Sequence, residues 1–466
     1  MVKINNSLLI DFYKRFNKKE TNIIAKNAIT SNSLDDVSLN RDVVQSINPT
    51  FYKKIEVDTE ITDQKMSGRC WIYSLLNVIR LHMIQKYDLE EDFELSQNYL
   101  LFWDKLEKAN MFLHHIFDTC HCKINSRLLS ILLKEPVQDG GQWNMLVNLV
   151  NKYGIIPKQQ MEDTVQSNNT DKMNEFINNK LLQYANQIRK LSDKEKTNKN
   201  KIIKDMLYEI YSILVMFLGT PPKSFVWKYY SEQPPINKKK KGSKKNKKTN
   251  IKSKKYQHST NIITPLQFYQ NIVPYDVNDK VVLINAPMKS KPYYKMYNIE
   301  YFNNMVQGEK TKYVNVPIDI LIESAKKSID NNEAVWFGCD VSKYSNNEYG
   351  LFNDKVYDYK SIFGFDLELK KGENLEYMQS ILNHAMIFRG YDIDSKGNIS
   401  QWLVENSWGD DMGNNGYYIM SNDWFKKYVY QIIIDKKFLD KKTLDVLNKE
   451  PVLCPIWDPF GSLAIN

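Results

Sequence analysis

The sequence predicts an α+β fold in which helices come first and a largely antiparallel sheet follows. Three observations support this class. Apolar residues recur at helical spacing over much of the first half of the 466-residue chain. From Val281 onward, the chain changes to short runs rich in β-branched and aromatic residues, each bounded by Gly, Asn, Asp or Lys. Helices and strands do not alternate, so the pattern is not that of a parallel α/β sheet.

Several stretches of the first half are expected to be helical. Residues 70–86 are apolar on most faces, which predicts a helix buried in the core rather than one on the surface. Residues 94–135 show apolar positions separated by polar faces, and residues 143–153 resume this pattern after a break at 136–141. Residues 170–218 look helical again, polar at first and apolar at their end.

The second half is expected to supply the strands. Short β-rich runs bounded by turn-forming residues are typical of an antiparallel sheet. These runs are residues 281–287, 334–341, 384–393, 401–408, 416–421 and 430–435.

Composition sets limits on the class of protein. A hydrophobic content of 42% can form a substantial core. The first residues carry only a short apolar patch, so neither secretion nor membrane insertion is expected. Five irregularly placed cysteines do not form a disulfide framework, which favours a reducing, cytoplasmic setting. Cys120-His121-Cys122 has ligands at alternate positions and no second cluster, so neither a metal site nor a cofactor is expected.

The net positive charge of the chain comes from one low-complexity segment. Eleven lysines fall between Lys238 and Lys255, and without them the net charge of +9 would become −2. Such a stretch cannot bury apolar surface, so residues 236–257 are expected to be a disordered surface loop. The alternative is that this loop binds a nucleic acid or another polyanion through counterion release.

Cys70 carries the clearest chemical signal in the chain. It stands at the head of the expected helix 70–86, with Gln64 six residues before it. Unpaired N–H groups and the macrodipole at the amino end of a helix favour an anion. We therefore expect a lowered pKa for the Cys70 thiol and a thiolate nucleophile near neutral pH.

Further residues would complete a cysteine-based catalytic set. His384 is the one of six histidines that begins an apolar strand run, and Asn406 follows 22 residues later in another such run. A thiol nucleophile needs a base and a group that orients the base, roles that suit His384 and Asn406. The Gln64 amide and the backbone N–H of Cys70 would stabilise the oxyanion. Trp408 would cover the His384–Asn406 hydrogen bond and exclude water.

Taken singly, Cys70 and His384 would be interpreted as core residues, but their occurrence together with Gln64 and Asn406 favours catalysis. These motifs resemble those of the papain-like cysteine peptidases. Longer runs are similar to the bleomycin hydrolase and aminopeptidase C family within that class. The runs are residues 93–113, 139–158, 218–225, 334–341, 404–418 and 450–464.

The resemblance implies a papain-like core that is interrupted by large helical insertions. Cys70 and His384 lie 314 residues apart, against about 130–150 in smaller enzymes of this class. Ser67 stands where secreted members have a disulfide-forming cysteine, which again suits a reducing compartment. The expected division is an N-terminal segment packing on the core at 1–57, a helical half of the core at 58–98 and 136–162, a helical insertion at 99–135, a second insertion at 163–311, and a β-rich half with a C-terminal arm at 312–466.

The resemblance also implies residues that bind substrate. Gly140 and Gly141 match a glycine pair along which a substrate backbone lies extended, although a tight turn is the alternative interpretation. Trp408 is the third candidate in the cleft.

The last residues of the chain would limit the length of the substrate. By resemblance, the terminal carboxylate lies in the cleft and meets the free α-amino group of the substrate, so that one amino-terminal residue is removed at a time. Ala464 matches the end of the family run, but Ile465 and Asn466 follow it. We expect either that Cys70 trims these two residues or that Asn466 ends a longer arm that narrows the cleft. A frayed tail is the alternative, against which the tryptophan in 455–459 argues.

The expected function is that of a cytosolic thiol aminopeptidase acting on peptides and bleomycin-like amides. Its partners would be peptides with a free N-terminus and, by resemblance, further copies of the chain in a homohexamer. The alternative is a nucleic-acid-binding protein that acts through the lysine-rich loop or a basic channel. A catalytically dead scaffold is not expected, because no member of the set is missing: Gln64, Cys70, His384 and Asn406.

Overall fold

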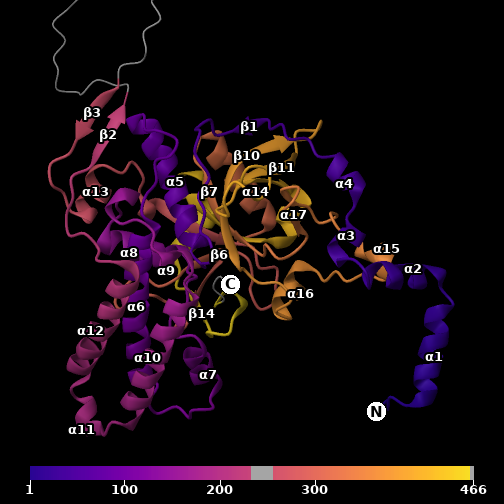
Figure 1. The fold of residues 1–466 in the computed structure, drawn as a ribbon, viewed down its shortest axis with the longest axis horizontal. Helices are drawn as coiled ribbons and strands as arrows, with labels where there is room; N and C mark the ends of the chain where they lie inside the picture. The colour runs from indigo at the N-terminus through magenta and orange to yellow at the C-terminus, as the bar shows by residue number, and fades with distance from the viewer. Residues whose placement is uncertain (232–254, 462–466) are drawn as a thin grey trace, which may run out of the picture.

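The computed structural model describes residues 1–231 and 255–461. Helices dominate the first half and a large sheet the second (Figure 1), which confirms the predicted α+β class. The lysine run before Lys255, and both Ala464 and Asn466, lie outside the described residues.

The helical half is built around α5, which begins at Cys70. All residues of α5 from Cys70 to Leu81 are buried, as the all-round apolar pattern predicts. α6, α10 and α12 pack together and extend from the body beside it (Figure 1). The helices of this half are α5 (Cys70–Tyr87), α6 (Gln97–Asp118), α7 (Arg127–Lys134), α8 (Trp143–Tyr153), α9 (Val165–Asn168), α10 (Asp171–Lys190), α11 (Asp193–Lys196), α12 (Lys199–Leu218) and α13 (Pro265–Asn271).

The large sheet contains 12 strands and is mostly antiparallel. Its order is β14-β5-β6-β4-β13-β7-β10-β11-β12-β9-β8, and β1 pairs with β10. β10 begins at His384, and its register pairs His384 with Cys339 and Ile387 with Glu405. The strands are β1 (Lys53–Lys54), β4 (Lys280–Ile284), β5 (Lys295–Ile299), β6 (Tyr313–Asn315), β7 (Val335–Cys339), β8 (Ser345–Asn346), β9 (Leu351–Phe352), β10 (His384–Ile393), β11 (Ile399–Glu405), β12 (Tyr417–Ser421), β13 (Val429–Asp435) and β14 (Val452–Cys454).

Short helices accompany the sheet. α14 packs across β10 and β13, and α17 lies against β11 and β12. They are α14 (Ile318–Asp330), α15 (Tyr359–Phe363), α16 (Lys371–Glu376), α17 (Asn422–Tyr428) and α18 (Lys441–Leu444). No helix of the described residues combines the length and the apolar character that a membrane crossing requires.

A separate hairpin joins β2 (Lys228–Ser231) to β3 (Tyr256–Ser259). Composition assigns residues 236–257 to a disordered loop, but β3 already begins at Tyr256. The predicted loop therefore extends two residues too far. Cross-strand stacking explains the difference, because the rings of Tyr229 and His258 lie 4.6 Å apart and almost parallel.

The N-terminal segment packs on the core only in part, which corrects the expectation for 1–57. Its helices are α1 (Asn6–Asn17), α2 (Glu20–Ile29), α3 (Leu34–Ser38) and α4 (Arg41–Gln45). α1 and α2 contain no buried residue, and α1 projects from the body (Figure 1). Contact with the body begins at α2, which lies against α15, and continues after α3, where Leu39 pairs with Tyr357. The apolar pattern of α1 predicts a helix with an apolar face but does not tell whether the chain itself covers that face.

Candidate active site

A cavity of about 400 Å³ lies between the first turn of α5 and the start of β10. Three of the four predicted catalytic residues line it: Gln64, Cys70 and His384. Trp408 lines the same cavity, and Asn406 lies behind His384. The fold thus brings together groups that are more than 300 positions apart in the sequence.

Cys70 is the first residue of α5, and it is only 1% exposed. Burial raises the pKa of its thiol to about 11, while the backbone N–H groups of Ala385 and Trp71 act in the opposite direction. The expected lowering of the thiol pKa is therefore wrong. Desolvation of the thiolate outweighs the favourable helix terminus, so the resting thiol is neutral.

His384 is held in a defined tautomer by Asn406. The Nε2 atom of His384 lies 2.9 Å from Oδ1 of Asn406. The backbone N–H of Ser407 donates to the same Oδ1 at 2.8 Å, which identifies that atom as the amide oxygen. Nε2 must then carry a proton, which leaves the lone pair of the imidazole on Nδ1. Burial lowers the pKa of His384 to about 4, and the bond to Asn406 opposes this shift.

Trp408 lies against the imidazole of His384. Its ring lies 4.7 Å from the His384 ring, centroid to centroid, with the two planes tilted by 33°. A large apolar ring in this position keeps water away from the His384–Asn406 hydrogen bond, which strengthens that bond.

Gln64 is fixed at both ends of its amide. Its Nε2 donates to the backbone carbonyl of Ser67 at 2.6 Å, and its Oε1 accepts from the hydroxyl of Ser407 at 2.8 Å. The backbone N–H of Gln64 also donates to the carbonyl of Ser407 at 2.8 Å. The second N–H of the amide takes no part in these bonds, so it can donate into the cavity.

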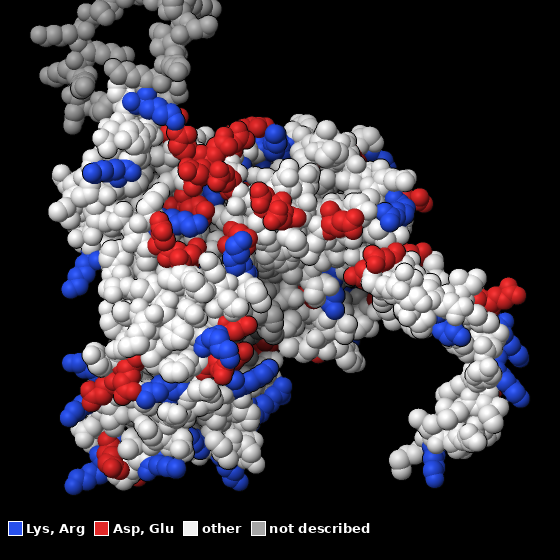
Figure 2. All heavy atoms as spheres, in the orientation of Figure 1, with Lys and Arg blue, Asp and Glu red and all other residues white. Residues whose placement is uncertain are grey.

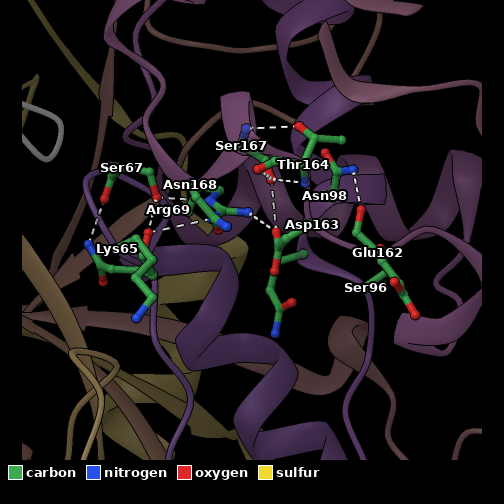
Figure 3. Close-up of polar contacts among 12 residues, drawn as sticks. Lys65, Ser67, Arg69, Ser96, Asn98, Glu162, Asp163, Thr164, Ser167 and Asn168 are labelled. Carbon is green, nitrogen blue, oxygen red and sulfur yellow. Dashed lines mark hydrogen bonds and ion pairs between the residues drawn. The ribbon is translucent and has the colours of Figure 1, made fainter. Parts of the chain in front are cut away.

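The segment between Gln64 and Cys70, which we call the catalytic loop (residues 64–70), is braced on one side by Arg69. Figure 3 shows the Arg69 guanidinium between Ser67 and the neighbouring segment that contains Asp163. Arg69 Nε donates to Ser67 Oγ at 2.8 Å, and Nη1 lies 2.6 Å from Asp163 Oδ1. The Arg69 side chain is fully buried, and a fixed ion pair of this kind holds the loop in one conformation.

Gly140 and Gly141 are buried beside Trp71 and do not line this cavity. The carbonyl of Gly140 accepts from Lys108 Nζ at 2.6 Å. A Cβ atom at Gly141 would lie 2.5 Å from the ring of Trp71, so close packing requires glycine there. Substrate binding by this pair stays a prediction.

Comparison with known proteins identifies the family. The sequence profile of the peptidase C1-like family matches residues 3–461. The chain belongs to the peptidase C1-like family. It is 38% identical to the bleomycin hydrolase of Rattus norvegicus over 99% of each chain, and 38% identical to the aminopeptidase C of Listeria monocytogenes over 98% of each. The crystal structure of PepW from Lactobacillus rhamnosis matches with a TM-score of 0.91 at 33% identity, covering 99% of this chain and 100% of that one.

These matches confirm the predicted resemblance and the papain-like fold. This C1-like protein is a cysteine-type peptidase. Its five cysteines, all within the described residues, are free thiols. Within the described ranges, no group of three or more His, Cys, Asp or Glu side chains is arranged to hold a metal ion.

Sequence reasoning missed several residues of the cavity in this C1-like peptidase. Asn383 directly precedes His384, and its amide links two loops, donating to Asp340 Oδ1 at 2.8 Å and accepting from the N–H of Val341 at 2.9 Å. In the sequence, only the position of Asn383 next to His384 could have indicated that it belongs to the site. Asp340 and Val341 come near it only through folding. The additional lining residues are Lys65, Met66, Ser67, Gly68, Asp171, Val341, Ser342 and Asn383.

Proposed function

We propose that this protein is a cysteine aminopeptidase that removes residues from the amino end of peptides and hydrolyses bleomycin-like amides. One observation carries the proposal. A thiol, an imidazole in a fixed tautomer and a side-chain amide meet at one cavity. The names of the relatives, bleomycin hydrolase and aminopeptidase C, support the substrate class.

In the proposed mechanism, His384 acts as the base toward Cys70. Because burial raises the thiol pKa and lowers the imidazole pKa, the resting pair is neutral. Proton transfer to His384 Nδ1 accompanies attack of the sulfur on the scissile carbonyl, which forms the C–S bond. The imidazolium, oriented by Asn406, then protonates the leaving amine as the C–N bond breaks. Water attacks the thioester in the second half of the cycle, releasing the acid and restoring the thiol.

The oxyanion of each tetrahedral intermediate would be stabilised by two donors. The first is the second N–H of the Gln64 amide. The other is the backbone N–H of Cys70, which belongs to the first turn of α5 and has no acceptor within the helix. Donors fixed in advance cost little reorganisation when charge develops on the oxygen, and each is worth a few kcal/mol of barrier.

We further propose that the C-terminal arm restricts the enzyme to amino-terminal cleavage. The described part of the arm is docked, which supports this role. β14 pairs with β5, Lys291 Nζ lies 2.5 Å from Asp458 Oδ2, and Phe460 is only 3% exposed. Gly461 borders a second cavity together with Gln138, which precedes the Gly140–Gly141 pair. The remaining residues would place a carboxylate, either that of Asn466 or that of Ala464 after trimming, opposite the α-ammonium group of the substrate.

A pair of matched substrates tests both parts of this function. The enzyme should hydrolyse a dipeptide amide with a free amine and discriminate against its N-acetylated twin, and Cys70→Ala should abolish both reactions. Deletion of residues 464–466 should reduce the discrimination. Mass spectrometry of the purified protein decides whether Ile465 and Asn466 are trimmed. Equal rates on the two substrates would exclude an aminopeptidase, and activity in the Cys70→Ala variant would exclude the thiol mechanism.

We propose that the protein works as a homo-oligomer in the cytosol. The exposed apolar side chains of α1 support association, since Leu9, Phe12 and Tyr13 are each at least half exposed. The five free thiols are consistent with a reducing compartment. Light scattering should give a mass that is a multiple of the chain mass, and removal of residues 1–30 should lower it. A monomer would contradict the association.

Nucleic-acid binding remains the second candidate, and the described surface does not favour it. Figure 2 shows carboxylates gathered on the face below the β2–β3 hairpin. Lys255, the last lysine of the run, forms an ion pair with Glu90, and Glu60 and Glu91 are joined by a backbone hydrogen bond at 3.0 Å. Such a surface repels phosphate groups. Deletion of residues 238–255 should leave peptidase activity unchanged, and it should abolish any polyanion binding.

A further inference from the structure

Asp139 does not line the catalytic cavity, yet it contacts the chain on both sides of Cys70. Its carboxylate Oδ2 accepts from the backbone N–H of Gly68 at 3.0 Å. Its backbone carbonyl accepts from the indole Nε1 of Trp71 at 2.7 Å. One residue therefore holds the catalytic loop two positions before the thiol and α5 one position after it.

The contact with Gly68 continues directly to Gln64. The peptide unit between Ser67 and Gly68 is planar, and in a trans peptide its N–H and C=O groups point in opposite directions. The N–H group donates to Asp139, while the carbonyl of Ser67 accepts from Gln64 Nε2 at 2.6 Å. A carboxylate at one end of the peptide polarises it, which makes the carbonyl at the other end a stronger acceptor for the Gln64 amide.

Lys105 of α6 neutralises the buried carboxylate. Its Nζ lies 2.5 Å from Asp139 Oδ1, and the exposed fractions of the two side chains are 0% and 3%. Asn174 donates to the same oxygen at 2.8 Å, and the hydroxyl of Thr170 donates to Oδ2. Burial alone would raise the pKa of the Asp139 carboxyl, but Lys105 and these hydrogen bonds hold it well below its usual range. The carboxylate is therefore ionised at every pH at which a peptidase works.

The charge balance matters for Cys70 as well. The Asp139 carboxylate acts to raise the pKa of the Cys70 thiol, in the same direction as burial. An unpaired carboxylate at this position would oppose formation of the negative sulfur and of the oxyanion. The ion pair with Lys105 weakens that field, so Asp139 can orient the loop with less opposition to the chemistry.

We propose that Asp139 is a positioning residue for the oxyanion site. Through the Ser67–Gly68 peptide, it holds one N–H of the Gln64 amide, so that the other N–H points to the place where the oxyanion forms. Lys105 is the counter-ion that makes this arrangement compatible with a thiolate nearby. The inference rests on the proposed role of Gln64 and Cys70.

A double-mutant cycle between Asp139 and Gln64 tests the proposal. Asp139→Asn should lower kcat by about tenfold, less than the loss of a whole oxyanion donor, and should change KM by less than about twofold. In a Gln64→Ala background, Asp139→Asn should cause no further loss, because the amide through which it acts is absent. The neutral double variant Lys105→Met with Asp139→Asn avoids an unpaired buried ammonium and should show the same pattern.

Two inhibitors separate positioning from general damage. A peptide aldehyde forms a hemithioacetal whose oxygen needs the oxyanion site, so its affinity for Asp139→Asn should fall in parallel with kcat. Alkylation of Cys70 by iodoacetamide forms no oxyanion, and it should not become slower. Asp435→Asn is a matched control, because Asp435 also accepts from a backbone N–H at 3.0 Å and lies 2.9 Å from a lysine, Lys280, and neither residue lines the cavity. It should leave kcat unchanged.

Additive losses in the cycle would overturn the proposal, and so would a parallel loss of alkylation. These outcomes differ from a failure of the proposed function itself. If wild-type activity does not depend on Cys70 or Gln64, the proposed mechanism fails. If it depends on both and the cycle is additive, only the role of Asp139 fails.

Discussion

A methyl group added at Gly141 should disturb the first turn of α5. The new Cβ would lie 2.5 Å from Cη2 and Cζ3 of the Trp71 ring and 2.6 Å from Cζ2. Because carbon atoms pack at about 3.5–4.0 Å, the ring or the glycine must move by about 1 Å.

The ring has little freedom to move. Trp71 is 1% exposed, and its Nε1 is bonded to the Asp139 carbonyl. Its own carbonyl accepts from Trp336 Nε1 at 3.1 Å. The strain therefore passes into the backbone of α5, where Cys70 is the preceding residue. Overpacking of this kind costs about 1–3 kcal/mol of unfolding free energy, and a displacement of about 1 Å at a catalytic group can cost about 100-fold in rate.

Thermal unfolding and steady-state kinetics on one preparation measure both effects. Gly141→Ala should lower the melting temperature and reduce kcat/KM, chiefly through kcat. The three crowded atoms belong to the six-membered ring of the indole, whose outer part phenylalanine lacks. Trp71→Phe should therefore recover part of the stability lost in Gly141→Ala, so the two changes should be strongly non-additive.

The opposite result would assign a different role to the glycine. If Gly141→Ala keeps the melting temperature and raises only KM, the position serves substrate binding, as the family resemblance suggests, and the packing argument is wrong. Additive effects of Gly141→Ala and Trp71→Phe would also refute it.

Three further predictions concern the imidazoles. Asn406→Ala should lower kcat about tenfold, since it removes a hydrogen bond worth about 1 kcal/mol and frees the ring to rotate; an unchanged kcat would contradict the orienting role. The kcat/KM of the wild type should rise with pH through a limb near pH 4, where His384 loses its proton and becomes able to accept one from Cys70; a limb near 6.5 would refute this. The unfolding free energy should fall as the pH drops from about 6.5 to about 4. In this range His384 and His115 bind a proton in the unfolded chain, whereas burial keeps them neutral in the folded protein. In the His115→Gln variant, the unfolding free energy measured by denaturant titration at each pH should fall less steeply as the pH drops.

Local patterns predicted the elements that carry the site. The apolar run after Cys70 became α5, and the run that begins with His384 became β10. The predicted run 401–408 became β11, which begins at Ile399 and ends at Glu405, just before Asn406. Periodicity predicts such elements because burial on one face or on all faces leaves a regular trace in the sequence. Local patterns did not predict the start of β3 or the exposure of α1. The start of β3 depends on a partner strand, and the exposure of α1 depends on what the body leaves uncovered.

Residue types predicted the chemistry of the site but not its energetics. A thiol at a helix terminus suggested a lowered pKa, yet burial raises it to about 11. Asp139 contacts both Lys105 and Gly68, and these three residues lie in separate segments of the chain. No periodicity or motif in the sequence connects them. The contacts of Asn383 with Asp340 and Val341 are of the same kind.

The sequence by itself determined the family and the order of helices and strands, and it supplied the proposed identities of the nucleophile, the base and the group that orients the base. These follow from short motifs and from periodicity, both of which are local properties of the chain. Only the tertiary structure decided how deeply Cys70 is buried, which tautomer His384 adopts, and how Asp139 reaches the catalytic loop. Desolvation and hydrogen-bond geometry depend on neighbours that are distant in the sequence, and folding alone brings those neighbours together.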